Sequence, residues 1–327
     1  MKSYKKLKSH FKPIVLLIAP KLYYRRLVKI AIREMNVNSL CISTASSISY
    51  NCIGKYPTMY NSPPEFYEKR KRSMLRDKDG IPMYIIDNKP VYDPTYIIQY
   101  GLSEYGFFVS THDKSHFETA RKIAEWLLDN QDVVSGYWYY SYNYTHKFTK
   151  FLLEAPWASA MAQGQAISLL TRMYKVTNEY KYISAAKKAT KMFDVPIVSG
   201  GLASEMWGHT VYEEYPTIPY SLTLNGFMFC ALGIYDLTQA TDDKQVAELW
   251  NKAKDTLNFM VPLYDGDIMS AYCLSHVTVG NVQRDWADRY NSIHVTMLQC
   301  FESFIPSPTF KFYIKRWASF FGIVINK

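Results

Sequence analysis

Three segments of the chain combine tyrosine with a charged side chain and a histidine, which are groups that can move protons. They are residues 207–219, 263–276 and 284–294. The first contains two adjacent carboxylates, Glu213 and Glu214, followed directly by Tyr215. Carboxylates and phenols exchange protons with a substrate when burial and neighbouring charges bring their pKa values toward each other. Polar aromatic side chains gathered in loops on a rigid scaffold are typical of a functional site.

The elements that must position these loops are helices. Long apolar stretches cover residues 96–108, 157–177 and 222–238, and each is followed by an amphipathic stretch, at 116–128, 180–193 and 244–260. An apolar helix lies inside a fold, whereas an amphipathic helix covers it. Tyr174-Lys-Val-Thr177 and Tyr235-Asp-Leu-Thr238 end two of the apolar stretches in the same way. Inner–outer pairs repeated at this long period predict a mainly α protein, an α/α toroid or incomplete helical barrel.

The first 90 residues have a different composition. We predict a basic N-terminal region at 1–90, with short strands around a turn at Asp87 and Asn88, and an α/α-toroid catalytic domain at 91–327. The apolar run 14–19 is too short to span a bilayer and lacks a cleavage pattern, so it predicts neither an anchor nor a signal peptide. The basic, amphipathic stretch 22–35 favours peripheral contact with an anionic membrane face. The alternative for this stretch is a solvated arm.

Composition indicates the kind of partner. The net charge of +9 favours a polyanion, which is a nucleic acid, an anionic lipid or an acidic glycan. The 28 tyrosines suit a groove that stacks sugars and binds their hydroxyls. Five dispersed cysteines indicate a reducing compartment and no zinc site, and no glycine-rich dinucleotide loop is present. We therefore expect a cytoplasmic protein, with the inner membrane face as its peripheral location, and neither a metal nor another cofactor.

Several longer strings occur in an order that resembles one family, the D-glucuronyl C5-epimerases of heparan sulfate biosynthesis. The strings are Asp93-Pro-Thr-Tyr-Ile-Ile-Gln-Tyr-Gly-Leu102, Trp157-Ala-Ser-Ala-Met-Ala-Gln-Gly-Gln-Ala-Ile167, Glu213-Glu-Tyr-Pro-Thr-Ile-Pro219, Leu224-Asn-Gly-Phe-Met228 and Pro262-Leu-Tyr-Asp265. The resemblance covers roughly residues 80–320. It implies the helical catalytic domain of that family and its active site.

The resemblance also implies roles for individual residues. It places the acid/base glutamate at Glu214 and the catalytic tyrosines at Tyr215, Tyr272 and Tyr290. The chain departs from the animal members at Ser275 and Ala287, where they carry arginine, and we expect their large β-rich N-terminal portion to be absent or much reduced. Arg289 or Arg284 is the alternative group that would hold the uronate carboxylate.

Further residues are candidates for substrate binding, each with an alternative role in the scaffold. They are Trp157 and Trp207 as sugar platforms, Gln163, Gln165 and Asn225 on inner helices, His276, His294 and Arg289.

By this resemblance, the expected reaction inverts C5 of D-glucuronic acid units to give L-iduronic acid in an acidic polysaccharide. The predicted partner is that polysaccharide and no nucleic acid. A polysaccharide lyase and a non-catalytic glycan-binding protein are the alternatives, since helical toroids carry several activities. The sequence leaves the oligomeric state open, with a homodimer as one alternative.

Overall fold

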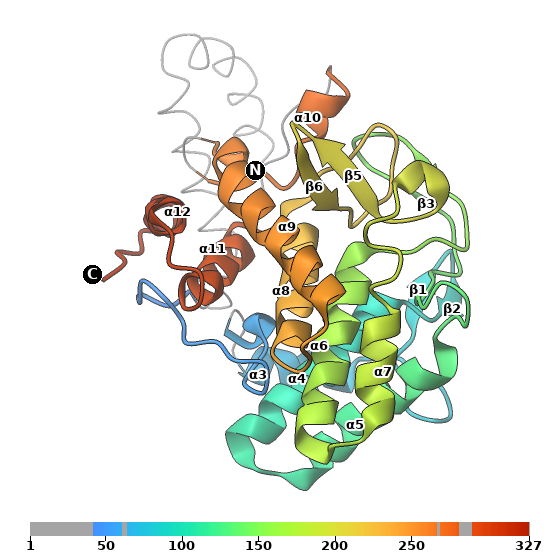
Figure 1. Ribbon diagram of the computed structural model, residues 1–327. Coiled ribbons are helices and arrows are strands. Elements are labelled where there is room, and N and C mark those ends of the chain that lie inside the picture. Colours follow the sequence, from blue (N-terminus) through green and yellow to red (C-terminus); the bar gives the residue numbers. More distant parts are fainter. Residues whose placement is uncertain (1–41, 61–63, 267–268, 281–289, 327) are drawn as a thin grey trace, which may run out of the picture.

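The computed structural model describes residues 42–60, 64–266, 269–280 and 290–326. Its main elements are helical hairpins, each made of an inner and an outer helix (Figure 1). The inner helices are α4 (Pro94–Thr111), α6 (Ala160–Thr177), α8 (Leu224–Thr238) and α11 (Tyr290–Glu302). Their outer partners are α5 (Lys114–Asn130), α7 (Tyr180–Lys188), α9 (Lys244–Met260) and α12 (Pro308–Ala318).

The inner helices form an incomplete ring. Helix α6 packs between α4 and α8, and α8 also contacts α11. The short helix η2 (Pro57–Tyr60) contacts both α4 and α11, so it bridges the first and last members of the ring. Each outer helix packs on its own inner helix. The predicted α/α toroid is therefore confirmed.

Helices α6 and α8 approach each other closely because glycines face each other at their crossing. A Cβ added to Gly233 would lie 2.0 Å from the carbonyl oxygen of Gly164. A Cβ added to Gly164 would lie 2.4 Å from the Cα of Cys230. Only glycine permits this contact between backbones.

The helix ends match the sequence pattern in most places. Asp93 caps α4 by accepting a 2.8 Å hydrogen bond from the backbone N–H of Tyr96. Helices α6 and α8 end at Thr177 and Thr238, where the two repeated strings end. Helix α7 ends at Lys188, short of the predicted residue 193, because the chain turns there and buries Phe193 in the core.

Short antiparallel hairpins lie between the helices. Strands β1 (Tyr84–Ile86) and β2 (Lys89–Val91) pair around Asp87 and Asn88, whose φ angles of 49° and 63° confirm the predicted tight turn. Strands β3 (Tyr144–Thr145) and β4 (Leu152–Leu153) form a second hairpin, and β5 (Ala203–Met206) and β6 (His209–Tyr212) a third. The remaining short elements are α3 (Pro64–Arg72), η3 (Ile197–Ser199), η4 (Val261–Tyr264), α10 (Ser275–Thr278) and η5 (Ser319–Phe321).

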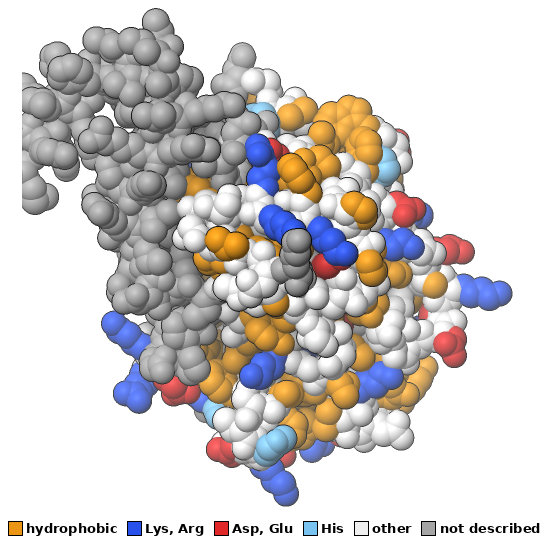
Figure 2. All heavy atoms as spheres, turned by 90° about the vertical axis from the view of Figure 1, so that its left-hand side faces the viewer, with side chains coloured by type: hydrophobic (Ala, Val, Ile, Leu, Met, Phe, Trp, Pro, Cys, Tyr) orange, Lys and Arg blue, Asp and Glu red, His pale blue; other side chains and the backbone are white. Residues whose placement is uncertain are grey.

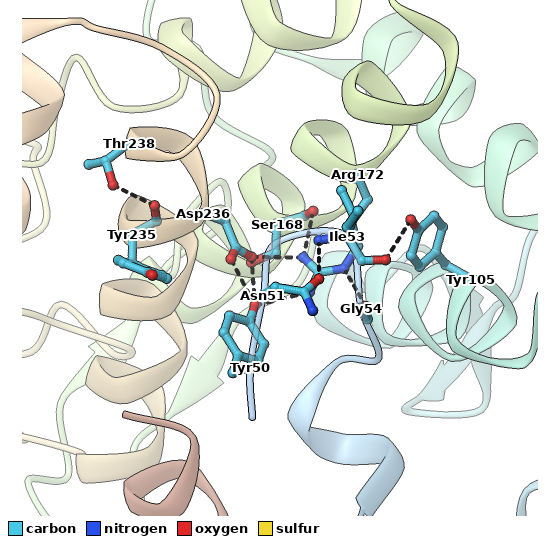
Figure 3. Close-up of polar contacts among 10 residues, drawn as sticks. All are labelled: Tyr50, Asn51, Ile53, Gly54, Tyr105, Ser168, Arg172, Tyr235, Asp236 and Thr238. Atoms are coloured by element: carbon cyan, nitrogen blue, oxygen red, sulfur yellow. Dashed lines mark hydrogen bonds and ion pairs between the residues drawn. The ribbon is translucent and has the colours of Figure 1, made fainter. Parts of the chain in front are cut away.

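The segment 42–60 covers the end of the toroid at the C-terminal halves of the inner helices. Its anchor is a buried ion pair between Arg172 of α6 and Asp236 of α8, with an Nη1–Oδ2 distance of 2.7 Å (Figure 3). The Tyr50 hydroxyl donates to Asp236 at 2.8 Å, and Arg172 Nη2 donates to the same hydroxyl at 2.9 Å. A buried pair needs such additional hydrogen bonds to offset its loss of hydration. Three residues of the same segment, Lys55, Thr58 and Met59, also contribute to the wall of a cavity that extends to the opposite end of the inner helices.

The structure does not test the other predictions for the N-terminal region. The stretches 14–19 and 22–35 lie outside the described residues, and the predicted division at residue 90 stays a prediction. Within the described ranges, no helix combines the length and the apolar character needed to cross a membrane. Figure 2 views the side of the molecule that carries α12 and the C-terminus, where Lys and Arg side chains are dispersed among apolar and uncharged ones.

Candidate active site

A cavity of about 990 Å³ opens at the N-terminal ends of the inner helices. Thr95 of α4, Met161 of α6, Asn225 of α8 and Ile293 of α11 all contribute to its wall. The N-terminus of a helix carries a partial positive charge, because its first N–H groups have no partners within the helix. The helix dipoles therefore partly offset the negative charge of the carboxylates in this wall, Asp93 and Glu214.

The two adjacent glutamates have different surroundings. Glu213 is fully buried and accepts hydrogen bonds from Ser204 Oγ at 2.8 Å, Ser221 Oγ at 2.9 Å and the Leu222 N–H at 3.0 Å. Its backbone carbonyl also accepts from the N–H of Ala160, where α6 begins. Burial raises the pKa of Glu213 to about 7, against the opposing effect of these hydrogen bonds. Glu213 thus connects strand β5, the start of α6 and the residues before α8, and these contacts fix the backbone position of Glu214.

Glu214 lines the cavity with only 7% of its surface exposed. Asn225 Nδ2 lies 3.5 Å from its Oε2. Burial raises the pKa of Glu214 to about 8, the charge of Glu213 adds to the rise, and a hydrogen bond with Tyr215 opposes it. A carboxylate with a pKa near neutrality is suited to take and return a proton.

Two of the predicted catalytic tyrosines, Tyr215 and Tyr272, lie near Glu214, and the third, Tyr290, packs on Tyr272. The hydroxyls of Tyr215 and Tyr272 are 3.5 Å apart, and the rings of Tyr272 and Tyr290 have centroids 4.6 Å apart. Burial, with the charge of Glu214 second, raises the pKa values of Tyr215 and Tyr272 well above 10. Both phenols are therefore protonated near neutral pH and available as donors. The structure brings together four residues from three separate segments, and their catalytic roles stay predictions.

Backbone contacts fix the second of these segments against α8. The N–H of Leu224, the first residue of α8, donates to the carbonyl of Tyr272 at 3.0 Å. The Tyr264 hydroxyl donates to the carbonyl of Leu222 at 2.7 Å. Tyr272 is thereby held beside the start of the helix that also supplies Asn225.

Sequence reasoning missed two residues that contact Tyr215. Tyr144 stacks on its ring at 5.2 Å, and the ring of His146 lies 5.0 Å away. The backbone N–H of Thr149 donates to His146 Nδ1 at 3.2 Å, and burial lowers the pKa of His146 to about 4, so the ring is neutral at pH 7. The one available signal was the aromatic segment 135–143, which ends directly before Tyr144.

Two of the predicted substrate-binding residues line the cavity, Trp157 and Asn225. The Trp157 ring stacks on Tyr140 with 4.0 Å between centroids, and its indole N–H donates to the carbonyl of Tyr142 at 2.8 Å. One face of the ring is therefore packed against protein, and its orientation is fixed. The side chain is positioned as a rigid wall of the cavity.

The other predicted binding residues that the structure describes are not among those that line the cavity. Gln163 is buried and bonds both backbone groups of Trp138. Gln165 and His294 are also buried, and His294 Nδ1 lies 2.7 Å from Ser270 Oγ. Their roles in substrate binding stay predictions, with a scaffold role favoured by burial.

Three predicted binding residues remain: Trp207, His276 and Arg289. Trp207 is 53% exposed in the β5–β6 turn and packs near Phe259, with ring centroids 6.5 Å apart. His276 lies half-buried in α10. Arg289 lies outside the described residues, as do Arg284 and Ala287.

The arrangement suits proton transfer by side chains. In the described part of the chain, no group of three or more His, Cys, Asp or Glu side chains could hold a metal ion. Glu214 and Tyr215 line the cavity and are hydrogen-bonded to each other, and the Tyr272 hydroxyl lies 3.5 Å from that of Tyr215. Such a set can remove a proton from a carbon acid and return one to it.

The chain has the fold of an α/α toroid, and a solved structure shares it. The chain matches the structure of cellobiose 2-epimerase from Bacillus thermoamylovorans B4167 with a TM-score of 0.51 and 10% sequence identity, over 78% of this chain and 71% of that one. At this identity the match shows the fold alone.

The sequence then defines the family. A family model described as "D-glucuronyl C5-epimerase C-terminus" matches residues 131–319, and the chain belongs to this family. A D-glucuronyl C5-epimerase of Caenorhabditis elegans is 34% identical over 203 residues, which are 58% of this chain and 33% of that protein. An uncharacterized protein of Methanocaldococcus jannaschii is 27% identical over 180 residues, 53% of each chain. The chain thus spans about a third to a half of the length of these relatives.

Proposed function

We propose that this protein inverts C5 of D-glucuronic acid units in an acidic polysaccharide, using only its own side chains. The observation that carries the proposal is the hydrogen bond between Glu214 and Tyr215 in the wall of the cavity, with the Tyr272 hydroxyl 3.5 Å from that of Tyr215. Membership of the epimerase family supports the same reaction class.

The reaction sets clear demands on the site. The C5 hydrogen lies beside a carboxylate, and its removal adds charge to a group that is already anionic. Donors and dipoles that strengthen as the enolate forms are therefore needed. The helix N-termini around the cavity supply such dipoles. Inversion also needs one group that takes the proton and a second that delivers a proton to the opposite face of the sugar ring.

Glu214, Tyr215 and Tyr272 can meet this demand as a connected set. In the proposed reaction, ionised Glu214 breaks the C5–H bond and becomes protonated. The Tyr272 phenol gives its proton to the opposite face of C5 and becomes a phenolate. The Tyr215 hydroxyl lies beside both groups, so it can pass the proton from Glu214 back to Tyr272. The reverse reaction uses the same set in the opposite direction.

Incorporation of deuterium tests the proposal. The protein is incubated with a heparosan-like glucuronate chain in heavy water, and C5 is examined by NMR and mass spectrometry. We expect deuterium at C5 together with iduronate units. A lyase would instead produce an unsaturated sugar that absorbs ultraviolet light, and a binding protein would catalyse no exchange. Folded protein that exchanges no C5 hydrogen with any uronate polymer would exclude the epimerase.

A further inference from the structure

The cavity continues far beyond the catalytic residues, along one face of α4. The α4 residues in its wall recur at helical spacing and include Thr95, Gln99, Ser103, Phe107 and Ser110. Fifteen residue steps of an α-helix extend roughly 22 Å. The cavity is therefore a groove, the α4 groove, which is much longer than one sugar ring.

The side chains of the α4 groove suit carbohydrate. Hydroxyls and an amide along α4 can bond sugar hydroxyls, and Tyr84, Tyr96 and Tyr100 add aromatic rings to the wall. Apolar side chains, among them Met59, Met74 and Ile86, complete this wall and can pack on the apolar faces of sugar rings.

The charges in the described wall differ between its two parts. Asp93 and Glu214 lie at the catalytic end, and the other charged side chains are the cations Arg70 and Lys55. The Arg70 guanidinium lies over the Tyr96 ring, 5.1 Å from its centroid. A groove that carries cations beyond the reacting unit is complementary to a chain with an anionic group on more than one unit.

The two cations lie at different levels of α4. The segment that contains Lys55 crosses α4 near Tyr105, whose hydroxyl donates to the carbonyl of Ile53 at 2.9 Å. Tyr96, under Arg70, and Tyr105 are nine residues apart, roughly 14 Å along a helix axis. The two cations therefore face different parts of a bound chain.

The wall that carries Arg70 is firmly attached to α4. Glu104, buried in α4, pairs with Lys71 Nζ at 2.7 Å and with His116 Nδ1 at 2.7 Å, and it accepts from the Tyr67 hydroxyl at 2.9 Å. Lys71 and Tyr67 belong to α3, next to Arg70. The groove is therefore built before a ligand arrives.

We propose that the α4 groove binds several successive units of an anionic polysaccharide, and that Arg70 and Lys55 each pair with an anionic group on a different unit. The inference rests on the proposed function for the identity of the reacting unit. Lys55, Arg70 and α4 precede residues 131–319, the region that the family model matches. In this proposal, the two cations favour long, acidic substrates.

Binding measurements on charge-neutralised variants test the proposal. The variants are Arg70→Gln and Lys55→Gln, with Lys244→Gln on the outer helix α9 as the matched control. Affinity for long heparosan, a heparosan tetrasaccharide and a neutral β-glucan is measured by calorimetry at low and high salt, after circular dichroism has confirmed the fold.

We expect each groove variant to weaken binding of long heparosan roughly fivefold, the effect of about one exposed ion pair. High salt should reduce this difference, because it screens exposed charges. Lys244→Gln should bind like the wild type, and the neutral glucan should bind weakly to all variants. Lys55→Gln should bind the tetrasaccharide normally if that ligand occupies only the catalytic end.

Two results would contradict the proposed binding role of the α4 groove. One is an affinity that does not increase with chain length, and the other is groove variants that bind long heparosan as tightly as the control. These readouts do not depend on catalysis. Normal C5 exchange by the wild type, together with unchanged binding by the groove variants, would exclude polysaccharide binding in the α4 groove and leave the epimerase proposal intact. Weaker binding by the groove variants, together with no C5 exchange by the wild type, would support polysaccharide binding in the α4 groove and exclude the epimerase proposal.

Discussion

Gly226 leaves the space that the side chain of Glu214 occupies. A Cβ built on Gly226 would lie 2.3 Å from both the Cβ and the Oε2 of Glu214. Gly226 belongs to the first turn of α8, next to Asn225, so the carboxylate rests directly on the start of that helix. The position of the proposed base therefore depends on a residue that carries no functional group.

Gly226→Ala should displace Glu214 and lower the C5 exchange rate on the order of a hundredfold, the size of a lost acid–base contribution. Overpacking of this kind also costs about 1–3 kcal/mol of folding free energy. Deuterium incorporation and chemical denaturation measure the two effects separately. Gly233→Ala is the matched control, because its new Cβ would meet the carbonyl oxygen of Gly164 at 2.0 Å, away from Glu214. Gly233→Ala should lose folding stability with a smaller loss of exchange rate. A normal exchange rate in Gly226→Ala would show that the position of Glu214 does not depend on Gly226.

Tyr215→Phe removes one hydroxyl and should interrupt the contact between Glu214 and Tyr272. We expect exchange to fall by about a hundredfold to ten-thousandfold, and Glu214→Gln to behave likewise. Because the two groups act as one unit, the double variant should be little slower than either single variant. Tyr139→Phe, which alters a more exposed tyrosine, serves as the control. Normal rates in both single variants would place the chemistry elsewhere, and a large loss of thermal stability would indicate a structural role for Tyr215.

The scaffold could be predicted from the sequence because its signal is local. The apolar or amphipathic character of a helix is contained in its own residues, as the ends of α6 and α8 show. The fourth inner–outer pair, α11 and α12, lies beyond the last pair that the apolar and amphipathic stretches predicted.

The neighbours of Tyr215 could not be predicted in this way. Tyr144 and His146 reach it from a hairpin whose strands have only two residues each, about seventy positions earlier in the chain. Short strands have almost no periodicity, and no local pattern encodes a contact between distant loops. Trp207 illustrates the same limit, because the sequence places it in the loop of Glu214 and the structure places it in an exposed turn. Whether a side chain lines the cavity or packs in the scaffold depends on its burial and its contacts, and both are set by tertiary structure.

Treatment with a chelator should leave C5 exchange largely intact. The proposed proton transfers use a carboxylate and phenols, and the described residues offer no cluster of three metal-binding side chains. Exchange is measured after dialysis against EDTA and again after addition of single divalent ions. A complete loss that one ion restores would show that a metal takes part in the reaction.

The raised pKa of Glu214 should make the folded protein less stable as the pH rises. Its pKa is about 8 in the fold, against an ordinary value of 4.5, so between these values the folded state binds a proton that the unfolded state has lost. The contribution to stability is therefore fully present below pH 4.5 and is lost as the pH rises through 8. Glu214→Gln cannot ionise and lacks this loss. Relative to the wild type, the variant should gain on the order of 4 kcal/mol in unfolding free energy between pH 4 and pH 9.

The two proteins are compared by urea denaturation across this pH range. Burial lowers the pKa values of His146 and His294 to about 4 and about 3, which makes stability rise with pH below 6.5. Both proteins share this effect, so it cancels in their difference. Glu205→Gln, at an exposed glutamate of β5, should give a curve parallel to that of the wild type. Over the same range the exchange rate of the wild type should rise toward pH 8, because only ionised Glu214 can take the C5 proton. A wild-type rate that is already maximal at pH 5, or a constant difference in stability between Glu214→Gln and the wild type, would show that Glu214 is ionised throughout and is not the base held near neutrality by burial.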